Sequence, residues 1–207
     1  MVQILKESVR KNILLAAESQ FAKSGFKRAT IAAIAKKAGV ATGNIYKYYS
    51  SKKELFEAVI TEEFVDKFLR LTRNRIGEFE QSQGIDPCRD YMENRAGELL
   101  HFWIKNRRKT VILLAHAEGT RYEDFVRIYI QDMKELAIAQ VRRQHPQIKM
   151  TDMLLFLLEK ALTDSVRGIV LTLEHFDDEE SILEAFGAGT AFQLGGLLAL
   201  FEWASKR

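Results

Sequence analysis

The chain has 207 residues, of which 47% are hydrophobic and 29% are charged, a composition typical of globular proteins and unlike that of disordered chains. Only two prolines interrupt it, which favours long helices, and the single cysteine, Cys88, excludes an intrachain disulfide and a cysteine-rich metal site. Charged residues near the start, such as Lys6 and Arg10, exclude the apolar core of a signal peptide, so we expect a cytoplasmic protein.

The net charge of +3 is unevenly distributed along the chain. Residues 1–60 hold 11 Lys or Arg and 4 Asp or Glu, a net charge of +7, whereas residues 61–207 have a net charge of −4. A basic segment joined to an acidic remainder indicates that one part meets a polyanion, although a solvated basic face is the commoner origin of such an excess.

The first predicted helix is marked by apolar residues at helical spacing. These residues are Val9, Ile13, Leu14, Ala17 and Phe21. We expect Gly25 to end the helix with a positive φ, which costs glycine little, and Phe26 to fold back onto it.

Two short helices are predicted next. Thr30 is a good N-cap, and it precedes a two-turn amphipathic pattern formed by Ile31, Ile34, Ala35 and Ala38. Gly39 ends this helix, and Thr42 is expected to cap a second short helix that runs to about Tyr49. The helix that begins at Ile31 buries small residues, so another helix must pack closely against it.

A longer helix is predicted from a capping box, because Ser51 and Glu54 form the pattern Ser-x-x-Glu. We expect one continuous helix from Lys52 towards Phe79. Its apolar face includes Leu55, Phe56, Val59, Ile60, Phe64, Phe68, Leu71 and Ile76.

The clearest break in the chain is the stretch QSQGIDP at residues 81–87. Beyond it, helical patterns predict helices near 88–105, 108–117, 121–145, 151–175 and 179–204. The apolar run TVILLA at 110–115 could be a buried strand, but we assign it to a helix because no partner strand is visible. The fold class expected is therefore all-α, with about nine helices.

Residues 30–56 read TIAAIAKKAGVATGNIYKYYSSKKELF, a short helix, a tight glycine turn and a second short helix. This order predicts a helix-turn-helix. Ala35 is small where the two helices cross, and Val40 and Ile45 can hold the second helix on the core. The remaining face of that helix can reach phosphates or base edges in a major groove, through Thr42, Gly43, Asn44, Lys47 and Tyr48.

The run T-x3-IA-x2-AGV-x-x-G-x-IY-x-Y-[FY]-x-SK-x-x-L resembles the TetR family of bacterial transcription regulators. The matching residues are Thr30, Ile34, Ala35, Ala38, Gly39, Val40, Gly43, Ile45, Tyr46, Tyr48, Tyr49, Ser51, Lys52 and Leu55. Upstream, Ala16, Phe21, Gly25 and Phe26 also fit the first helix of the family. The motif covers residues 8–60, and the remainder of the chain matches only in length and helical content.

The resemblance implies a homodimer that binds a palindromic operator through a DNA-binding domain at 1–52, followed by an effector-binding and dimerisation domain at 53–207. It implies that Thr30 touches a phosphate, that Tyr46, Tyr48 and Lys52 grip the DNA backbone, and that the groove is faced by Thr42, Gly43, Asn44 and Lys47. Asn44 departs from the small residue often found there and could make a bidentate contact to adenine. Tyr49 replaces a common Phe, for which we favour a core role.

The run AFGAGTAFQLGGLLALF at 185–201 is 17 residues long and contains Thr190 and Gln193, whereas a membrane helix needs roughly 20 apolar residues. We therefore expect no membrane span. Dimers of the family form through their last two long helices, so the resemblance assigns 151–175 and 179–204 to dimerisation. The alternative is a core helix within one chain.

An apolar or amphipathic small-molecule effector is expected in the C-terminal domain. The candidate ligand-binding residues are Phe68, Phe102, Trp103, His116, Tyr122, Phe125, Tyr129 and Arg167. Met92, Leu99 and Phe156 are further apolar candidates of the middle helices, and Glu118 and Arg121 are buried polar candidates. We expect His101 to be a core histidine and Cys88 to be a structural thiol rather than a redox sensor.

The sequence predicts no enzyme, cofactor or metal site. It contains no G-x-S-x-G elbow, P-loop or dinucleotide fingerprint, and its four histidines have no tight ligand spacing. Two alternatives to a regulator stay open: a helical enzyme without these motifs, and a DNA-binding structural protein of the same fold that takes no effector.

Overall fold

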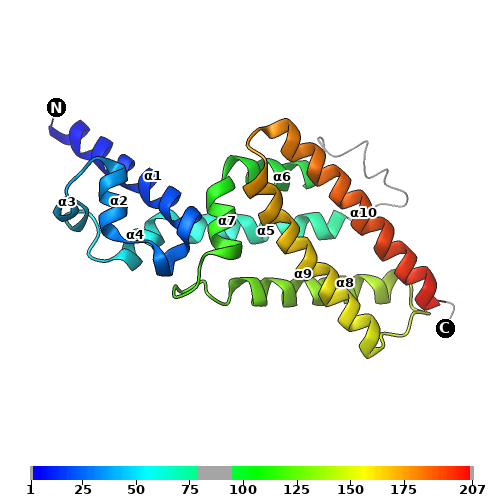
Figure 1. Ribbon diagram of the computed structural model, residues 1–207. Coiled ribbons are helices and arrows are strands. Elements are labelled where there is room, and N and C mark those ends of the chain that lie inside the picture. Colours follow the sequence, from blue (N-terminus) through cyan, green and yellow to red (C-terminus); the bar gives the residue numbers. More distant parts are fainter. Residues whose placement is uncertain (1, 79–94, 206–207) are drawn as a thin grey trace. The chain divides into compact units, whose positions relative to one another are not determined.

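The computed structural model describes residues 2–78 and 95–205, and these residues form ten α-helices and no strand (Figure 1). The helices are α1 (Val2–Arg28), α2 (Ile31–Ala38), α3 (Thr42–Tyr46), α4 (Lys52–Val59), α5 (Glu62–Glu78), α6 (Arg95–Lys105), α7 (Arg107–Ala115), α8 (Phe125–Gln144), α9 (Asp152–His175) and α10 (Glu179–Ser205). The all-α prediction is confirmed, including the helix assigned to the apolar run at 110–115.

Contacts divide the chain into two compact units. The N-terminal unit comprises the residues up to Lys67 together with Asn106–Phe125, and the C-terminal unit comprises Phe68–Lys105 together with Val126–Arg207. These compact units do not coincide with the DNA-binding and effector-binding domains expected to meet at 52/53, because α7 packs on α1. The functional boundary at 52/53 stays a prediction.

The continuous helix expected from Lys52 towards Phe79 is wrong, since the chain breaks between α4 and α5. Ile60 leaves helical geometry (φ −103°, ψ 85°), and the hydroxyl of Thr61 accepts a hydrogen bond from the amide of Phe64 at 3.2 Å. A threonine that caps the next turn competes with continuation of the helix. The apolar pattern does not reveal the break, because Ile60 is itself fully buried.

The N-terminal unit is built on α1, which packs against α2, α4 and α7. Its centre holds the rings of Phe21, Phe26 and Phe56, whose centroids lie 5.2–6.0 Å apart in tilted and edge-on pairs. Ile13 and Ile34 are fully buried beside them. The predicted return of Phe26 onto the first helix is confirmed.

The predicted glycine turns and caps of the N-terminal unit hold in part. Gly39 (φ 69°) ends α2, and Thr30 caps α2 by accepting from Ala33 N at 3.1 Å. Gly25 has the predicted positive φ (72°), but it kinks α1 rather than ending it, since α1 continues to Arg28. Thr42 does not cap α3, because Ala41 holds that position without a side-chain bond, and α3 ends at Tyr46 rather than near Tyr49.

The capping box at the start of α4 forms with one difference. The Ser51 hydroxyl accepts from the amide of Glu54 at 3.1 Å, as predicted. The Glu54 carboxylate, however, accepts from the amide of Ser50 at 2.7 Å rather than from that of Ser51. The Ser50 hydroxyl also donates to this carboxylate, at 2.5 Å, and the hydroxyl and amide bonds together lower the pKa of Glu54.

The C-terminal unit contains α6, α9, α10, most of α8 and the part of α5 from Phe68 onward. The ring of Phe68 is fully buried and lies 6.4 Å from Phe102, 6.1 Å from Trp103 and 5.5 Å from Tyr129, measured between centroids. Helix α10 contacts α9 and α6. The expectation that Phe156 belongs to the interior is wrong, because its side chain on α9 is 66% exposed.

Candidate DNA-binding surface and effector cavity

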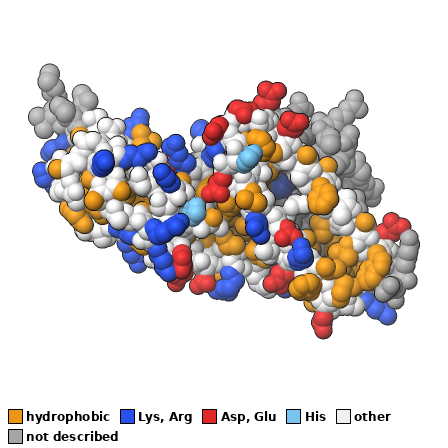
Figure 2. Space-filling model, in the orientation of Figure 1, with side chains coloured by type: hydrophobic (Ala, Val, Ile, Leu, Met, Phe, Trp, Pro, Cys, Tyr) orange, Lys and Arg blue, Asp and Glu red, His pale blue; other side chains and the backbone are white. Residues whose placement is uncertain are grey.

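The second helix of the helix-turn-helix presents a polar face to solvent. Ile45 is completely buried and holds α3 on the core, while Tyr46 on the same helix is 54% exposed. Thr42, Gly43 and Lys47 are also exposed, and Asn44 is half-buried. This face carries side chains that can bond to phosphates and base edges, and Figure 2 shows Lys and Arg side chains spread over the N-terminal unit.

Two of the predicted backbone contacts already have partners within the N-terminal unit. The Thr30 oxygen accepts the bond that caps α2, which leaves its proton to donate elsewhere. The Tyr48 hydroxyl donates to the carbonyl of Lys6 at 3.3 Å. Tyr49 is 3% exposed and its hydroxyl accepts from Arg10 Nε at 3.4 Å, so the core role expected for it is confirmed.

Lys52 is half-buried, and its ammonium bonds within the N-terminal unit. Its ammonium donates to the carbonyls of Phe26 (2.8 Å), Ala29 (3.0 Å) and Lys27 (3.3 Å), and it lies 4.5 Å from the centroid of the Phe26 ring. An ammonium has three donors, and these three carbonyls occupy them. Lys52 therefore joins α4 to the end of α1, and its predicted contact with the DNA backbone stays a prediction.

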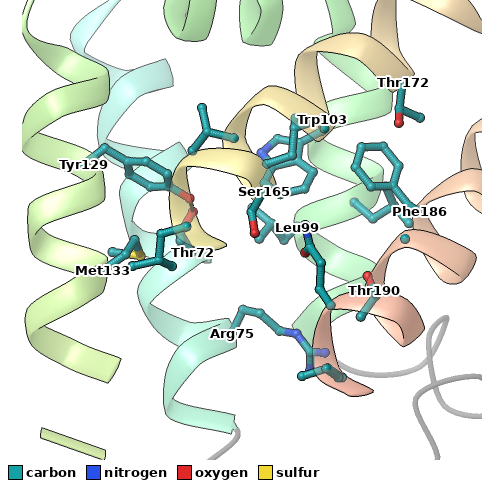
Figure 3. Close-up of a pocket in the computed structure, with 18 of the residues that line it drawn as sticks. Thr72, Arg75, Leu99, Trp103, Tyr129, Met133, Ser165, Thr172, Phe186 and Thr190 are labelled. Atoms are coloured by element: carbon teal, nitrogen blue, oxygen red, sulfur yellow. Dashed lines mark hydrogen bonds between the residues drawn. The ribbon is translucent and has the colours of Figure 1, made fainter. Parts of the chain in front are cut away.

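A cavity of about 300 Å³ lies within the C-terminal unit, among side chains of α5, α6, α8, α9 and α10 (Figure 3). Its walls are mainly aliphatic and aromatic. The lining residues include Leu99, Leu100, Trp103, Tyr129, Ile130, Met133, Leu162, Val166, Ile169, Phe186, Leu194 and Leu197. Among the described residues, the polar part of the lining consists of Thr72, Arg75, Ser165, Thr172, Thr190 and Gln193.

Two polar side chains at the cavity wall, Tyr129 and Thr72, form hydrogen bonds within the C-terminal unit. The Tyr129 hydroxyl donates to Thr72 Oγ1 at 3.4 Å, and the Thr72 hydroxyl donates to the carbonyl of Phe68 at 3.0 Å. Burial raises the pKa of Tyr129 to about 12. The phenol is therefore neutral at physiological pH, and its proton is directed at Thr72.

The indole of Trp103 is different. It lies between the rings of Phe68 and Phe186 and is only 9% exposed, and Nε1 has no hydrogen-bond partner among the described residues. A buried N–H without an acceptor costs free energy.

The cavity unites part of the predicted effector set. Trp103 and Tyr129 line it, and Phe68 packs directly behind both. Phe102 contacts Phe68 but does not line the cavity. The cavity lining does not include Arg167, which is exposed on α9, or three predicted residues that belong to the N-terminal unit: His116, Tyr122 and Phe125.

The buried polar candidates were also misassigned. Glu118 is exposed and forms an ion pair with Lys27, and Arg121 pairs with Glu62 at 2.7 Å. The side chain of His101 is 56% exposed and lies 3.8 Å from Glu179, so it is no core histidine. Cys88 and Met92 lie outside the described residues.

Sequence reasoning missed Thr72 and Arg75. A signal was present, because Phe68, Thr72 and Arg75 follow one another at spacings of four and three residues and so share one face of α5. That face carries the buried ring of Phe68, and the two polar residues next to it point the same way.

Helices α9 and α10 leave large apolar side chains uncovered. Phe192 is 83% exposed and Leu171 is 54% exposed, and Met153 and Trp203 are each 41% exposed. Figure 2 shows hydrophobic side chains gathered over the region where α9 begins and α10 ends. By length and composition alone α10 could cross a membrane, with a mean hydropathy of 1.3 over its most apolar window, but a helix that packs on a partner has the same composition.

Comparison with known proteins finds a family match near the N-terminus and a structure of similar fold. Residues 13–59 match the family described as bacterial regulatory proteins, tetR family. Nucleoid occlusion factor SlmA of Pasteurella multocida (strain Pm70) is 30% identical over 113 residues. The matched region is 55% of this chain and 53% of the relative, so the chain spans about half the length of that protein. A TetR-like transcriptional regulator from Rhodococcus sp. RHA1 shares the fold, with a TM-score of 0.57 at 20% identity over 92% of this chain and 96% of that one.

Proposed function

Because its N-terminal helices are those of the TetR family of bacterial regulators, we propose that this protein is a DNA-binding transcriptional repressor in the cytoplasm. It would bind a palindromic operator as a homodimer through the helix-turn-helix at 31–49. The observation that carries the proposal is the exposed polar face of α3 on a buried Ile45 anchor. A recognition helix needs this combination, since it must be fixed to the core and open to the groove.

Lys47→Ala and Tyr46→Ala test this assignment in a mobility-shift assay on a selected operator. Each change removes a group that can contact DNA without touching the buried core, so we expect operator binding to be lost while the dimer persists. Lys23→Ala is the matched control, because Lys23 is an exposed lysine of α1 outside the helix-turn-helix. If the α3 variants bind the operator as the wild type does, α3 is not the recognition helix.

We further propose that α9 and α10, which correspond to the helices predicted at 151–175 and 179–204, form the homodimer. The exposed apolar side chains of these helices support this, because monomeric proteins rarely leave such patches uncovered. The glycines of α10 support it too: a Cβ added at Gly195 or Gly196 would meet nothing within 4 Å, which leaves room for another helix to approach.

We propose that the effector binds in the C-terminal cavity and shifts a conformational equilibrium of the protein. Helix α5 supplies Thr72 and Arg75 to that cavity, and the chain enters α5 directly from α4, which packs on α1. A ligand that favours one position of α5 would thereby change the spacing of the two α3 helices of a dimer. Reciprocity then requires that the operator weaken effector binding by the same factor.

A further inference from the structure

We infer that the cavity of the C-terminal unit takes a compact, apolar and uncharged molecule whose hydrogen-bond acceptor, a carbonyl or ether oxygen, receives the indole N–H of Trp103. This inference rests on the proposed function only where it calls that molecule the effector. The ligand class itself follows from the walls of the cavity and from one buried donor.

The walls set the size and the body of the ligand. A volume of about 300 Å³ is at the lower end of small-molecule pockets, which run from about 300 to 1,000 Å³. Leu99, Met133, Ile169 and Phe186 give the cavity an apolar interior. The ligand is therefore compact, with an aliphatic or aromatic body.

Trp103 supplies the demand for an acceptor. Its side chain is more than nine-tenths buried, it lines the cavity, and Nε1 has no partner in the described part of the chain. Buried polar groups without a partner are rare in folded proteins, so each one calls for an explanation. An indole N–H can only donate, and an acceptor atom of a ligand in the cavity would satisfy it.

Three hydroxyl groups of the lining do not offer their protons in the same way. The hydroxyl of Tyr129 donates to Thr72 at 3.4 Å, and those of Thr72 and Ser165 donate to carbonyls of their own helices, α5 and α9. Of the buried polar groups in the described lining, Trp103 Nε1 is the one left without a partner.

The same donor favours an uncharged acceptor. A carboxylate would give up its hydration between apolar walls, and a single neutral N–H replaces little of it. A ketone, ester or ether oxygen has less hydration to lose and can accept the same bond. Arg75 of the described lining already has an interaction of its own in the protein, so we assign it no part in binding.

Probes that differ only at the acceptor isolate this bond. Calorimetry compares linear alkyl phenyl ketones of increasing chain length with the alkylbenzenes in which CH2 replaces the carbonyl. Both series are titrated into the full-length wild type and into Trp103→Phe, which keeps a ring and removes the donor. The ratio of ketone affinity to hydrocarbon affinity should fall about fivefold to tenfold in Trp103→Phe. Hydration of the probes cancels in this comparison, because each probe enters both proteins from the same solvent.

Trp203→Phe is the matched control and should leave the ratio unchanged, because this tryptophan is exposed on α10 and does not line the cavity. The chain has two tryptophans, so Trp103 is the single indole of this variant. Its N–H then gives one signal in a proton–nitrogen correlation spectrum. The ketone should move that proton downfield relative to the hydrocarbon, because a new hydrogen bond deshields it. This measurement decides even if thermal unfolding shows that Trp103→Phe does not fold.

An unchanged affinity ratio in Trp103→Phe, an indole proton that responds alike to both probes, or no binding by either series would each overturn the inference. A keto acid that binds as tightly as the neutral ketone of the same length would overturn the uncharged class. Operator binding is measured separately on the same preparations. Ketone binding without operator binding would refute the proposed function and keep the ligand class, whereas operator binding without ketone binding would do the reverse.

Discussion

The ammonium of Lys52 lies 4.5 Å above the Phe26 ring and donates to the Phe26 carbonyl at 2.8 Å. One side chain thus satisfies carbonyls at the end of α1, where no intrahelical donor is available, and ties α4 to that end. The helix-turn-helix lies between these two helices in the chain, and its first helix, α2, packs on α1.

Replacing Lys52 with methionine should destabilise the protein by about 2 kcal/mol, because charge-assisted hydrogen bonds to part-buried carbonyls are lost. Lys53→Met is the control, since Lys53 is exposed one residue further along α4. Urea unfolding followed by circular dichroism measures both. Equal stability of the two variants would mean that the junction contributes nothing.

Gly25→Ala should destabilise the protein by at least about 1 kcal/mol. The φ of 72° is strained for any residue with a Cβ. Space is not the cause, because the nearest atom to that Cβ, His116 Nδ1, would lie at 3.6 Å, an ordinary van der Waals contact. Thermal unfolding measures the loss.

Gly43→Ala, in contrast, should leave stability nearly unchanged and weaken operator binding. This glycine has no positive φ, and a Cβ there meets nothing within 4 Å, so the free energy of unfolding should stay within about 0.5 kcal/mol of the wild type. Its exposed position on α3 should instead make the added methyl group weaken operator binding. Wild-type operator affinity in Gly43→Ala would remove this residue from the DNA interface.

Stability should fall between pH 10 and pH 12 because of Tyr129. Burial raises its pKa from 10.0 to about 12 in the folded chain, so the phenol ionises first in the unfolded state. This contribution is complete below pH 10 and is lost as pH approaches 12, in total about 2–3 kcal/mol. Tyr129→Phe should show a shallower decline of unfolding free energy than the wild type, and Tyr46→Phe, at an exposed site, should not.

If the proposed dimer forms through α10, Phe192→Asp should give a monomer at micromolar concentration. The side chain is 83% exposed on α10, and a carboxylate there cannot be buried against a second copy without a large desolvation cost. Sedimentation velocity measures the assembly, with Glu184→Gln as a control on an exposed residue of the same helix. A dimer that survives Phe192→Asp would place the interface elsewhere.

The sequence predicted what depends on short-range chemistry. Thr30, Gly25 and Gly39 take the conformations that their residue types favour, and Ile45 anchors α3 because apolar spacing fixes its face. The break at Ile60 escaped prediction, because apolar periodicity runs through it and a local cap at Thr61 decides the geometry.

The cavity was harder to predict for a different reason. Trp103 and Tyr129 are far apart in the chain, and only the packing of α6 and α8 around Phe68 brings them together. His116 and Tyr122 have the same residue character but fold into the N-terminal unit. Aromatic composition alone therefore could not separate the cavity residues from the core of the other unit.

The proposed function requires that this chain bind a specific DNA sequence as a dimer. Selection from a random double-stranded pool at near-physiological salt, with sequencing of the bound fraction, examines this requirement. We expect a palindromic consensus whose half-sites lie about one helical turn apart. A pool that enriches no sequence, with affinity that only falls steeply with salt, would contradict it and show a purely electrostatic contact.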